Sequence, residues 1–308
     1  METLYITHPA CRLHEMGTWH PECPERLDAI NDQLRANGIL DLLSQAEPAY
    51  ATDEDIRRVH DAGYVDELKA RQPVNGSYRA LDPDTLMNAH TLDAARAAAG
   101  AGIAAVDAVM AGSAATAFCA VRPPGHHARR AQAMGFCFFN NVAIAAAYAL
   151  EKHGLQRVAI VDFDVHHGNG TEEMFTGDPR VMMCSFYQHP FFPNLREEHP
   201  AGNMLNTPVP AYTTGARVRR LVDDVWVPRL LAYRPEMICI SAGFDAHRED
   251  DMGQLDLVES DFAWITAKMV EVADACCGGR IVSLFEGGYN LSALGRSVVA
   301  HVRALSKL

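Results

Sequence analysis

A run of acidic and imidazole side chains follows an apolar segment near the middle of the chain. Residues 158–166 read Val-Ala-Ile-Val-Asp-Phe-Asp-Val-His, and Gly168-Asn-Gly170 then form a turn. Alternate residues of an extended chain point to the same side and lie roughly 6.6 Å apart, so Asp164 and His166 can converge on one ion. Carboxylate and imidazole together suit Zn²⁺, Mn²⁺ or Fe²⁺. Asp162 lies farther back, and we expect it to support the ligands.

A second apolar run ends in an acidic residue that offers a third ligand. Residues 238–245 read Ile-Cys-Ile-Ser-Ala-Gly-Phe-Asp. Because the carboxyl ends of parallel strands meet at one edge of an open sheet, we expect Asp245 beside Asp164 and His166. Three protein ligands leave coordination positions open, as a catalytic metal site requires. His247 is the competing third ligand, although a surface loop accounts for it, and the alternative to a metal site is a strand end whose carboxylates only cap turns.

Two more strand-like runs end in residues suited to proton transfer and to oxyanion binding. Residues 116–121 lead into Arg-Pro-Pro-Gly-His126-His127, and histidine is well suited to move protons near neutral pH. Residues 280–285 lead into Glu-Gly-Gly-Tyr289, whose phenol can donate to a developing oxyanion. The alternatives are a pair of surface histidines and a glycine turn with a packing tyrosine. The shared position after a strand favours the catalytic interpretation.

The segments that would position these residues alternate between strand and helix from about residue 90 onward. Their apolar runs are nearly continuous, which is typical of parallel strands covered on both faces. The order predicts an α/β fold, a doubly wound and mostly parallel sheet flanked by helices, in one domain over residues 1–308. The stretches 71–84 and 188–206 are predicted as long functional loops. We expect strands at 4–6, 116–121, 157–163, 180–186, 236–241 and 280–285, and helices at 26–37, 92–111, 140–153, 217–232 and 261–275.

The composition is that of a folded protein with ample material for a core. The 308 residues are 48% hydrophobic and 21% charged, which excludes disordered and fibrous classes. With 39 acidic against 27 basic residues the formal charge is −12, so nucleic-acid binding through phosphate neutralisation is not expected. Eight cysteines without a Cys-x-x-Cys pair indicate neither a disulfide framework nor a thiolate zinc site. We find no signal peptide or membrane-spanning run, and therefore expect a soluble cytoplasmic protein.

In combination these segments resemble the histone deacetylase superfamily, the zinc amidohydrolases that include acetylpolyamine amidohydrolases and bacterial deacetylase-like proteins. The resemblance implies an arginase-like form of the α/β fold, with the active site at the carboxyl ends of the strands. It also implies hydrolysis of the amide of acetyl-lysine or a related small acyl-amine through a metal-activated water. The matching stretches are His20-Pro-Glu-Cys-Pro-Glu-Arg-Leu27, Arg122-Pro-Pro-Gly-His-His127, Gly135-Phe-Cys-Phe-Phe-Asn-Asn141, Asp162-Phe-Asp-Val-His-His-Gly-Asn-Gly170, Ser241-Ala-Gly-Phe-Asp-Ala246 and Glu286-Gly-Gly-Tyr289.

The resemblance also implies a role for each matching residue, while leaving open which histidine moves which proton. Asn169, where other members carry Asp, resembles the class II branch. The implied roles are zinc ligation by Asp164, His166 and Asp245; general acid–base chemistry by His127 with His126 as its electrostatic partner; donation to the oxyanion by Tyr289; support of the histidines by Asp162 and Asn169; a tunnel for the acyl-lysine stem at Gly135, Phe136, Phe192 and Met252; and a structural K⁺ around Asp162, Asp164, His166, Ser185 and Phe186.

Substrate choice is the part that the resemblance fixes least. Met252 stands in the mouth loop where polyamine-selective members can carry an acid, and Asn194-Leu-Arg-Glu-Glu-His199 replaces a usually Gly-rich sequence. Asp82 and Asp84 are candidates for anchoring a substrate backbone. The expected partner is an acylated lysine in a protein or peptide, or a small acylated amine, with neither nucleic acid nor membrane; a homo-oligomer is left open. The alternatives are an acetylpolyamine amidohydrolase, a two-manganese ureohydrolase of the same fold, and a non-catalytic module that binds acyl-amines.

Overall fold

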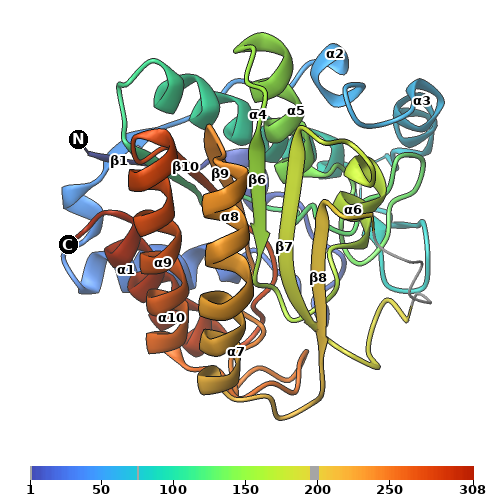
Figure 1. Ribbon diagram of the computed structural model, residues 1–308. Coiled ribbons are helices and arrows are strands. Elements are labelled where there is room, and N and C mark those ends of the chain that lie inside the picture. Colours follow the sequence, from blue (N-terminus) through green and yellow to red (C-terminus); the bar gives the residue numbers. More distant parts are fainter. Residues whose placement is uncertain (1, 75, 195–200) are drawn as a thin grey trace.

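Eight parallel strands form the central sheet of the computed structural model, which describes residues 2–74, 76–194 and 201–308. Their spatial order is β2-β1-β5-β10-β9-β6-β7-β8 (Figure 1). A short antiparallel hairpin, β3 (Arg79–Ala80) with β4 (Leu86–Met87), stands apart from the sheet. The sheet strands are β1 Thr3–Ile6, β2 Ser44–Ala46, β5 Thr116–Cys119, β6 Val158–Asp162, β7 Val181–Gln188, β8 Met204–Val209, β9 Met237–Ala242 and β10 Ile281–Phe285.

The six predicted strands are all present, with ends that differ by one or two residues. The central strands β6, β9 and β10 are buried at every position, which is why continuous apolar runs marked them in the sequence. The two outermost strands, β2 and β8, were not predicted. No residue of β2 is buried, and β8 carries half-buried polar residues and the exposed Pro208, so neither has an apolar run to reveal it.

Helices cover both faces of this sheet (Figure 1). On one face α4 and α5 pack against each other, α4 against β5 and β10, and α5 against β6 and β9. On the other face α9 packs against β9, and α10 contacts both α9 and α1. This is the predicted doubly wound α/β architecture. The helices are α1 Glu25–Ala36, α2 Asp53–Ile56, α3 Ala62–Arg71, α4 Thr91–Met110, α5 Asn141–Lys152, α6 Asn169–Phe175, α7 Gly215–Leu221, α8 Val227–Tyr233, α9 Glu259–Cys277 and α10 Leu291–Leu305, with 3₁₀ turns at Pro9–Arg12 and Leu40–Leu42.

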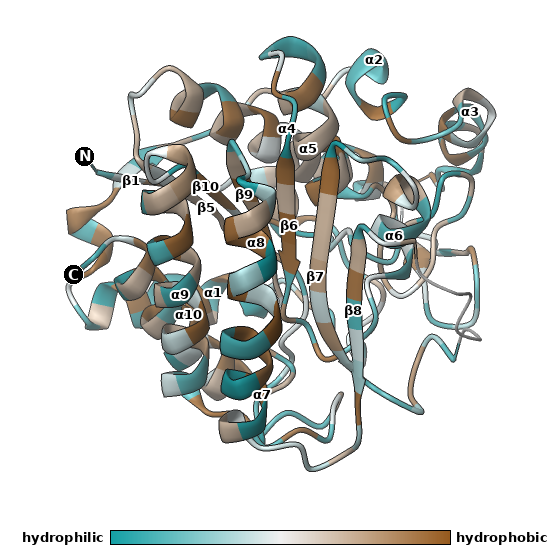
Figure 2. Cartoon of the chain, in the orientation of Figure 1, coloured by the Kyte–Doolittle hydropathy of each residue, from teal (hydrophilic) through white to brown (hydrophobic). Residues whose placement is uncertain are grey.

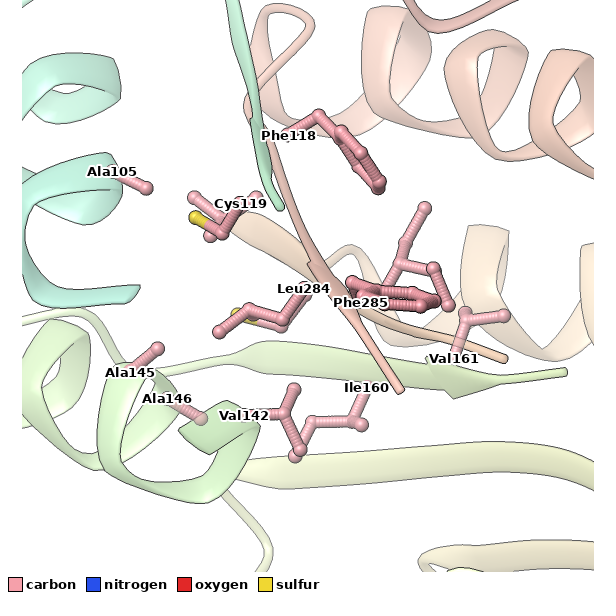
Figure 3. Close-up of a cluster of buried hydrophobic side chains, with 14 of the residues drawn as sticks. Ala105, Phe118, Cys119, Val142, Ala145, Ala146, Ile160, Val161, Leu284 and Phe285 are labelled. Atoms are coloured by element: carbon pink, nitrogen blue, oxygen red, sulfur yellow. The ribbon is translucent and has the colours of Figure 1, made fainter. Parts of the chain in front are cut away.

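The hydrophobic core lies on both sides of the sheet. In β10 the neighbouring Leu284 and Phe285 point to opposite faces, Leu284 toward the side of Ala105 in α4 and Ala145 in α5 (Figure 3). Phe118 of β5 lies on the same side as Phe285, and all five residues are buried. Strands β6 and β7 are accordingly hydrophobic along most of their length, whereas the outer helix α7 is largely hydrophilic (Figure 2).

Four of the five predicted helices have the expected bounds within two residues. The fifth, 217–232, is divided into α7 and α8 by a π-helical turn at Val222–Trp226. Helix α10 was not predicted, because its glycine and serines weaken the helical signal. The structure gives the reason for Gly295: a Cβ there would lie 2.5 Å from Gln33 Cγ of α1. Close packing of α1 on α10 therefore outweighs local propensity.

The two stretches predicted as long loops are shorter than expected. β7 continues to Gln188 and β8 begins at Met204, while 71–84 contains the strand β3. The replaced sequence 194–199 lies outside the described residues except for Asn194. All eight cysteines are free thiols. None of the helices in the described ranges is long and apolar enough to cross a membrane.

Candidate metal centre and active site

Asp164, His166 and Asp245 come together at the carboxyl ends of the strands. Each offers one ligand atom, and these atoms lie within 4.8 Å of one another in a buried position. His166 Nδ1 is 3.0 Å from Asp164 Oδ1 and 3.3 Å from Asp245 Oδ2. The sequence predicted that Asp164 and His166 converge from alternate positions of an extended strand, but β6 already ends at Asp162. Asp164 and His166 therefore lie in the loop beyond the strand, where the His166 N–H donates to Asp164 Oδ1.

The donor atoms of this cluster suit a divalent cation. The second oxygen of each carboxylate is held by the main chain, since Val165 N–H donates to Asp245 Oδ1 and Gly287 N–H to Asp164 Oδ2. Asp245 Oδ2 is buried and, among the described residues, accepts no hydrogen bond. A Cβ on Gly287 would overlap this oxygen, so the turn needs glycine to pass so close. Two carboxylate oxygens and one imidazole nitrogen thus face a common point, a donor set typical of Zn²⁺ or a similar ion.

Without a cation the two buried carboxylates oppose each other. Burial and the charge of Asp164 raise the pKa of Asp245 to about 7. Burial would also raise the pKa of Asp164, but His126 and His166 outweigh it and lower that pKa. A positive charge at the centre would relieve this repulsion.

The adjacent His126 and His127 lie beside this centre, with ring centroids 4.0 Å apart. Both are buried, but their partners differ. His126 Nδ1 donates to the Asp162 carboxylate at 2.9 Å, whereas His127 Nδ1 donates to the amide oxygen of Asn169 at 2.7 Å. Burial would lower the pKa of His126, but Asp164 and Asp162 raise it well above the usual value. For His127, burial and the neighbouring imidazoles lower the pKa well below its usual value.

A buried glutamate that the sequence analysis did not single out holds the turn carrying the histidines. Glu286 Oε2 accepts the N–H groups of Gly125 (2.6 Å) and His126 (3.2 Å), and Oε1 accepts the Ser241 hydroxyl (3.0 Å). Burial raises the pKa of Glu286 to about 7. The signal in the sequence was a charged residue placed directly after an apolar strand.

A second buried ionic network holds the Glu-Gly-Gly-Tyr turn and was likewise missed. Glu22 pairs with both Arg122 and Arg26, and all three are buried. Arg26 donates to the carbonyls of Gly288 (2.7 Å) and Glu286. Its guanidinium also lies over the ring of Tyr289, 4.7 Å from the centroid. Sequence spacing could not reveal this network, because Glu22 and Arg122 are far apart in the chain.

Tyr289 lies near the cluster that it was predicted to serve. Burial raises its pKa well above the usual value, and the charges of Asp245 and Asp164 raise it further against the lowering effect of Arg26. The phenol therefore keeps its proton and remains a hydrogen-bond donor at neutral pH. Its ring meets that of Phe136 edge-on, with centroids 5.8 Å apart.

Two aromatic residues predicted to form a tunnel contact different catalytic candidates. Phe192 meets the His127 ring edge-on at 5.1 Å, while Phe136 contacts Tyr289. Phe136 has φ +68° and follows Gly135 at φ +55°. A Cβ on Gly135 would lie 2.5 Å from His127 Cδ2, so this glycine lets the wall approach the imidazole. Met252 is partly exposed in the loop after β9.

Three further residues were singled out in the sequence: His247 as a competing ligand, and Asp82 and Asp84 as candidates for anchoring a substrate backbone. His247 does not join the metal cluster and is buried rather than on a surface loop: it lies 3.6 Å from Glu259 and stacks on Phe262. Asp82 Oδ1 accepts the N–H groups of Asp84 and Thr85. Thr85 Oγ1 in turn accepts the Phe136 N–H at 3.1 Å, so this acidic loop supports the aromatic wall.

Two residues of the expected potassium site, Ser185 and Phe186, lie on β7 next to β6. Ser185 is paired with Asp162 in the β6–β7 register, and its hydroxyl donates to Asn206 Oδ1 at 2.8 Å. The buried ring of Phe186 stacks on Trp226. These contacts neither require nor oppose a cation at this position.

Comparison with known proteins agrees with this geometry. The histone deacetylase domain model matches residues 20–305. A histone deacetylase-like amidohydrolase of Pseudomonas aeruginosa is 36% identical over 88% of this chain and 73% of its own length. The human polyamine deacetylase HDAC10 is 37% identical over 92% of this chain and 45% of its own. The crystal structure of the HDA15 HD domain superposes with a TM-score of 0.92 at 31% identity, covering 100% of this chain and 90% of that one. The chain belongs to the histone deacetylase family.

Proposed function

We propose that this chain is a zinc-dependent amidohydrolase that removes an acetyl, or another small acyl group, from a lysine-like amine. The observation that carries the proposal is the convergence of Asp164, His166 and Asp245 beside the His126–His127 pair. A bound zinc ion would polarise the acyl carbonyl and lower the pKa of water in the site. The family match over residues 20–305 supports one catalytic domain spanning the chain.

The chain's own groups supply proton transfer and charge stabilisation. His127, paired with the neutral amide of Asn169, accepts the proton of the attacking water and returns one to the leaving amine. His126, paired with the carboxylate of Asp162, is held as a cation beside it. The Tyr289 hydroxyl donates to the oxyanion that forms on the acyl carbon.

The aromatic residues bind and orient the acyl-amine stem. Phe136 and Phe192 stand beside Tyr289 and His127 respectively, so an extended apolar stem between them would reach the reacting groups. Ser185 and Phe186, with Asp162, Asp164 and His166, are proposed to hold a structural K⁺ behind the zinc.

Acetylpolyamines are the second candidate substrate, because a human relative is named a polyamine deacetylase. Against that preference, Met252 adds no negative charge at the mouth. A two-manganese ureohydrolase is less well supported, since the described residues hold a single His/Asp cluster of the kind that binds an ion.

The experiment compares acetyl-lysine peptides, acetylpolyamines and longer acyl-lysines with one zinc-loaded preparation. We expect turnover of at least one class, lost on chelation and restored by zinc. An Asp245→Asn variant provides the matched inactive control, because it retains shape but removes one ligand charge. Zinc bound at one per chain without turnover of any of the three would reject the proposal, and a stoichiometry near two would favour the ureohydrolase.

A further inference from the structure

One buried carboxylate joins the Tyr289 turn to the loop that carries Met252. Asp250 is 4% exposed. Its Oδ2 accepts the backbone N–H groups of Tyr289 at 2.6 Å and Asn290 at 2.9 Å, and its Oδ1 accepts the N–H of Met252 at 3.0 Å. A single side chain therefore accepts hydrogen bonds from three main-chain N–H groups.

The Tyr289 turn depends on such contacts for its position. It follows the last residue of β10 and precedes α10, which begins at Leu291. Gly288, with φ +120°, gives the backbone rotational freedom immediately before the tyrosine. Arg26 holds the carbonyls on one side of the turn, and Asp250 holds the amides that follow. A negative charge just before a helix N-terminus is also electrostatically favourable.

The same carboxylate fixes the mouth loop. Met252 is the residue predicted for the mouth of the substrate tunnel, and its N–H donates to the Asp250 oxygen that does not hold Tyr289. The connection is doubled by Asn290, whose side-chain amide donates to the Glu249 carbonyl at 2.9 Å. The Met252 loop and the Tyr289 turn are thereby held by the same buried side chain.

We propose that Asp250 is a positioning residue that sets the Tyr289 hydroxyl against the substrate carbonyl and couples it to the Met252 loop. The inference rests on the proposed amidohydrolase function and deepens it. Asp250 itself touches neither substrate nor metal in this assignment; it acts through the two backbone segments that it holds.

The isosteric change Asp250→Asn breaks this arrangement in a defined way. An amide has one accepting oxygen, so either the Tyr289–Asn290 pair or Met252 must face an NH₂ group instead. The buried donor left without an acceptor then has to move.

Asp261→Asn is the matched control. Asp261 is also buried near a helix start, accepting the Val258 N–H at 3.0 Å and a bond from Arg219, but it lies in α9, outside the proposed site.

The first test is a double-mutant cycle in the zinc-loaded 308-residue chain. We expect Asp250→Asn to lower kcat by at least about 10-fold with one zinc per chain retained, while Asp261→Asn leaves kcat per folded molecule unchanged. Adding Asp250→Asn to Tyr289→Phe should cost less than about twofold more, because the tyrosine hydroxyl is already absent. Fully additive losses, or equal losses in Asp250→Asn and Asp261→Asn, would overturn the inference.

A second readout does not depend on turnover. With 3-fluorotyrosine incorporated, the Tyr289 signal is assigned from its absence in Tyr289→Phe, and we expect it to shift or broaden in Asp250→Asn but not in Asp261→Asn. An unchanged Tyr289 signal in Asp250→Asn would overturn the positioning role. If the wild-type enzyme hydrolysed no acyl-amine while this signal still moved, the proposed function would fail and the positioning would stand.

Discussion

The two histidines of the site differ in the group that receives their Nδ1–H. A carboxylate such as Asp162 stabilises an imidazolium more strongly than the neutral Asn169 amide does. The pKa of His126 is raised and that of His127 is lowered, although their ring centroids lie only 4.0 Å apart. Neighbouring groups with opposed environments are a common basis of acid–base chemistry in enzymes. Here the charge of Asp164 and the adjacent imidazoles add to the difference between Asp162 and Asn169.

Replacing Tyr289 by Phe tests the oxyanion role at the residue scale. The change removes only the hydroxyl, so zinc content should stay at the wild-type value while kcat falls by about 10²-fold or more. Steady-state kinetics with metal analysis on the same samples gives both numbers. Tyr212→Phe, at a side chain that is 69% exposed, is the control and should retain full activity. Unchanged kcat in Tyr289→Phe would remove the oxyanion role.

At the scale of elements, strand ends and glycine turns bring main chain into contact with the metal cluster. The turn after β10 passes over both carboxylates at Gly287, and a Cβ there would lie 2.6 Å from Asp164 Oδ2 while overlapping Asp245 Oδ2. We predict that Gly287→Ala weakens zinc binding by at least about 10-fold, because the ligands must move apart.

Zinc titration monitored by calorimetry measures this effect. Gly63→Ala in α3 is the control, since its new Cβ would meet no described atom within 4 Å apart from its chain neighbours and the backbone of its own helix. It should bind zinc normally and stabilise the helix by up to about 1 kcal/mol. Equal zinc affinity in the two variants would show that the close approach at Gly287 has no bearing on the ligands.

The parts of the structure differ in how well the sequence predicted them. Apolar runs ending in polar residues predicted β6 and β9, with Asp164 and Asp245 at their ends, because parallel strands in a buried sheet leave a strong local signal. Glu286 had only its place directly after an apolar strand as a signal, and Asp250 and the Glu22–Arg122 pair gave no comparable one. Their partners are backbone groups or distant side chains, which only the folded chain brings together.

At the scale of the whole molecule, the buried carboxylates of Asp164 and Asp245 repel each other, and a bound cation would relieve this repulsion. Zinc binding only the folded state should raise the free energy of unfolding by about 2.7 kcal/mol at 100 times its Kd. Thermal unfolding of chelated and zinc-loaded protein measures the change in Tm. The gain should be largely lost in Asp245→Asn, and an unaltered wild-type Tm on zinc addition would contradict the expected coupling.

Two histidines remote from the metal centre make the fold sensitive to acid. His60 Nδ1 donates to the Arg129 carbonyl while Nε2 accepts the Asn140 N–H, and His301 lies between the hydroxyls of Thr266 and Ser283. Burial lowers the pKa of His60 to about 4 and that of His301 to about 3. Both rings are therefore neutral in the folded chain at pH values where the unfolded chain protonates them.

The sign of the pH dependence follows from these directions. Below the unfolded pKa of about 6.5 the unfolded state binds more protons, so stability is fully present above that pH. It falls by about 1.4 kcal/mol per pH unit for each histidine, down to about pH 4 for His60 and about pH 3 for His301. In urea titrations across this range, His301→Gln should start less stable at pH 7 but lose stability with a slope smaller by about one proton. The exposed His90, changed to Gln, should leave the slope unaltered. An equal slope in His301→Gln and wild type would mean that the buried ring takes up its proton without unfolding.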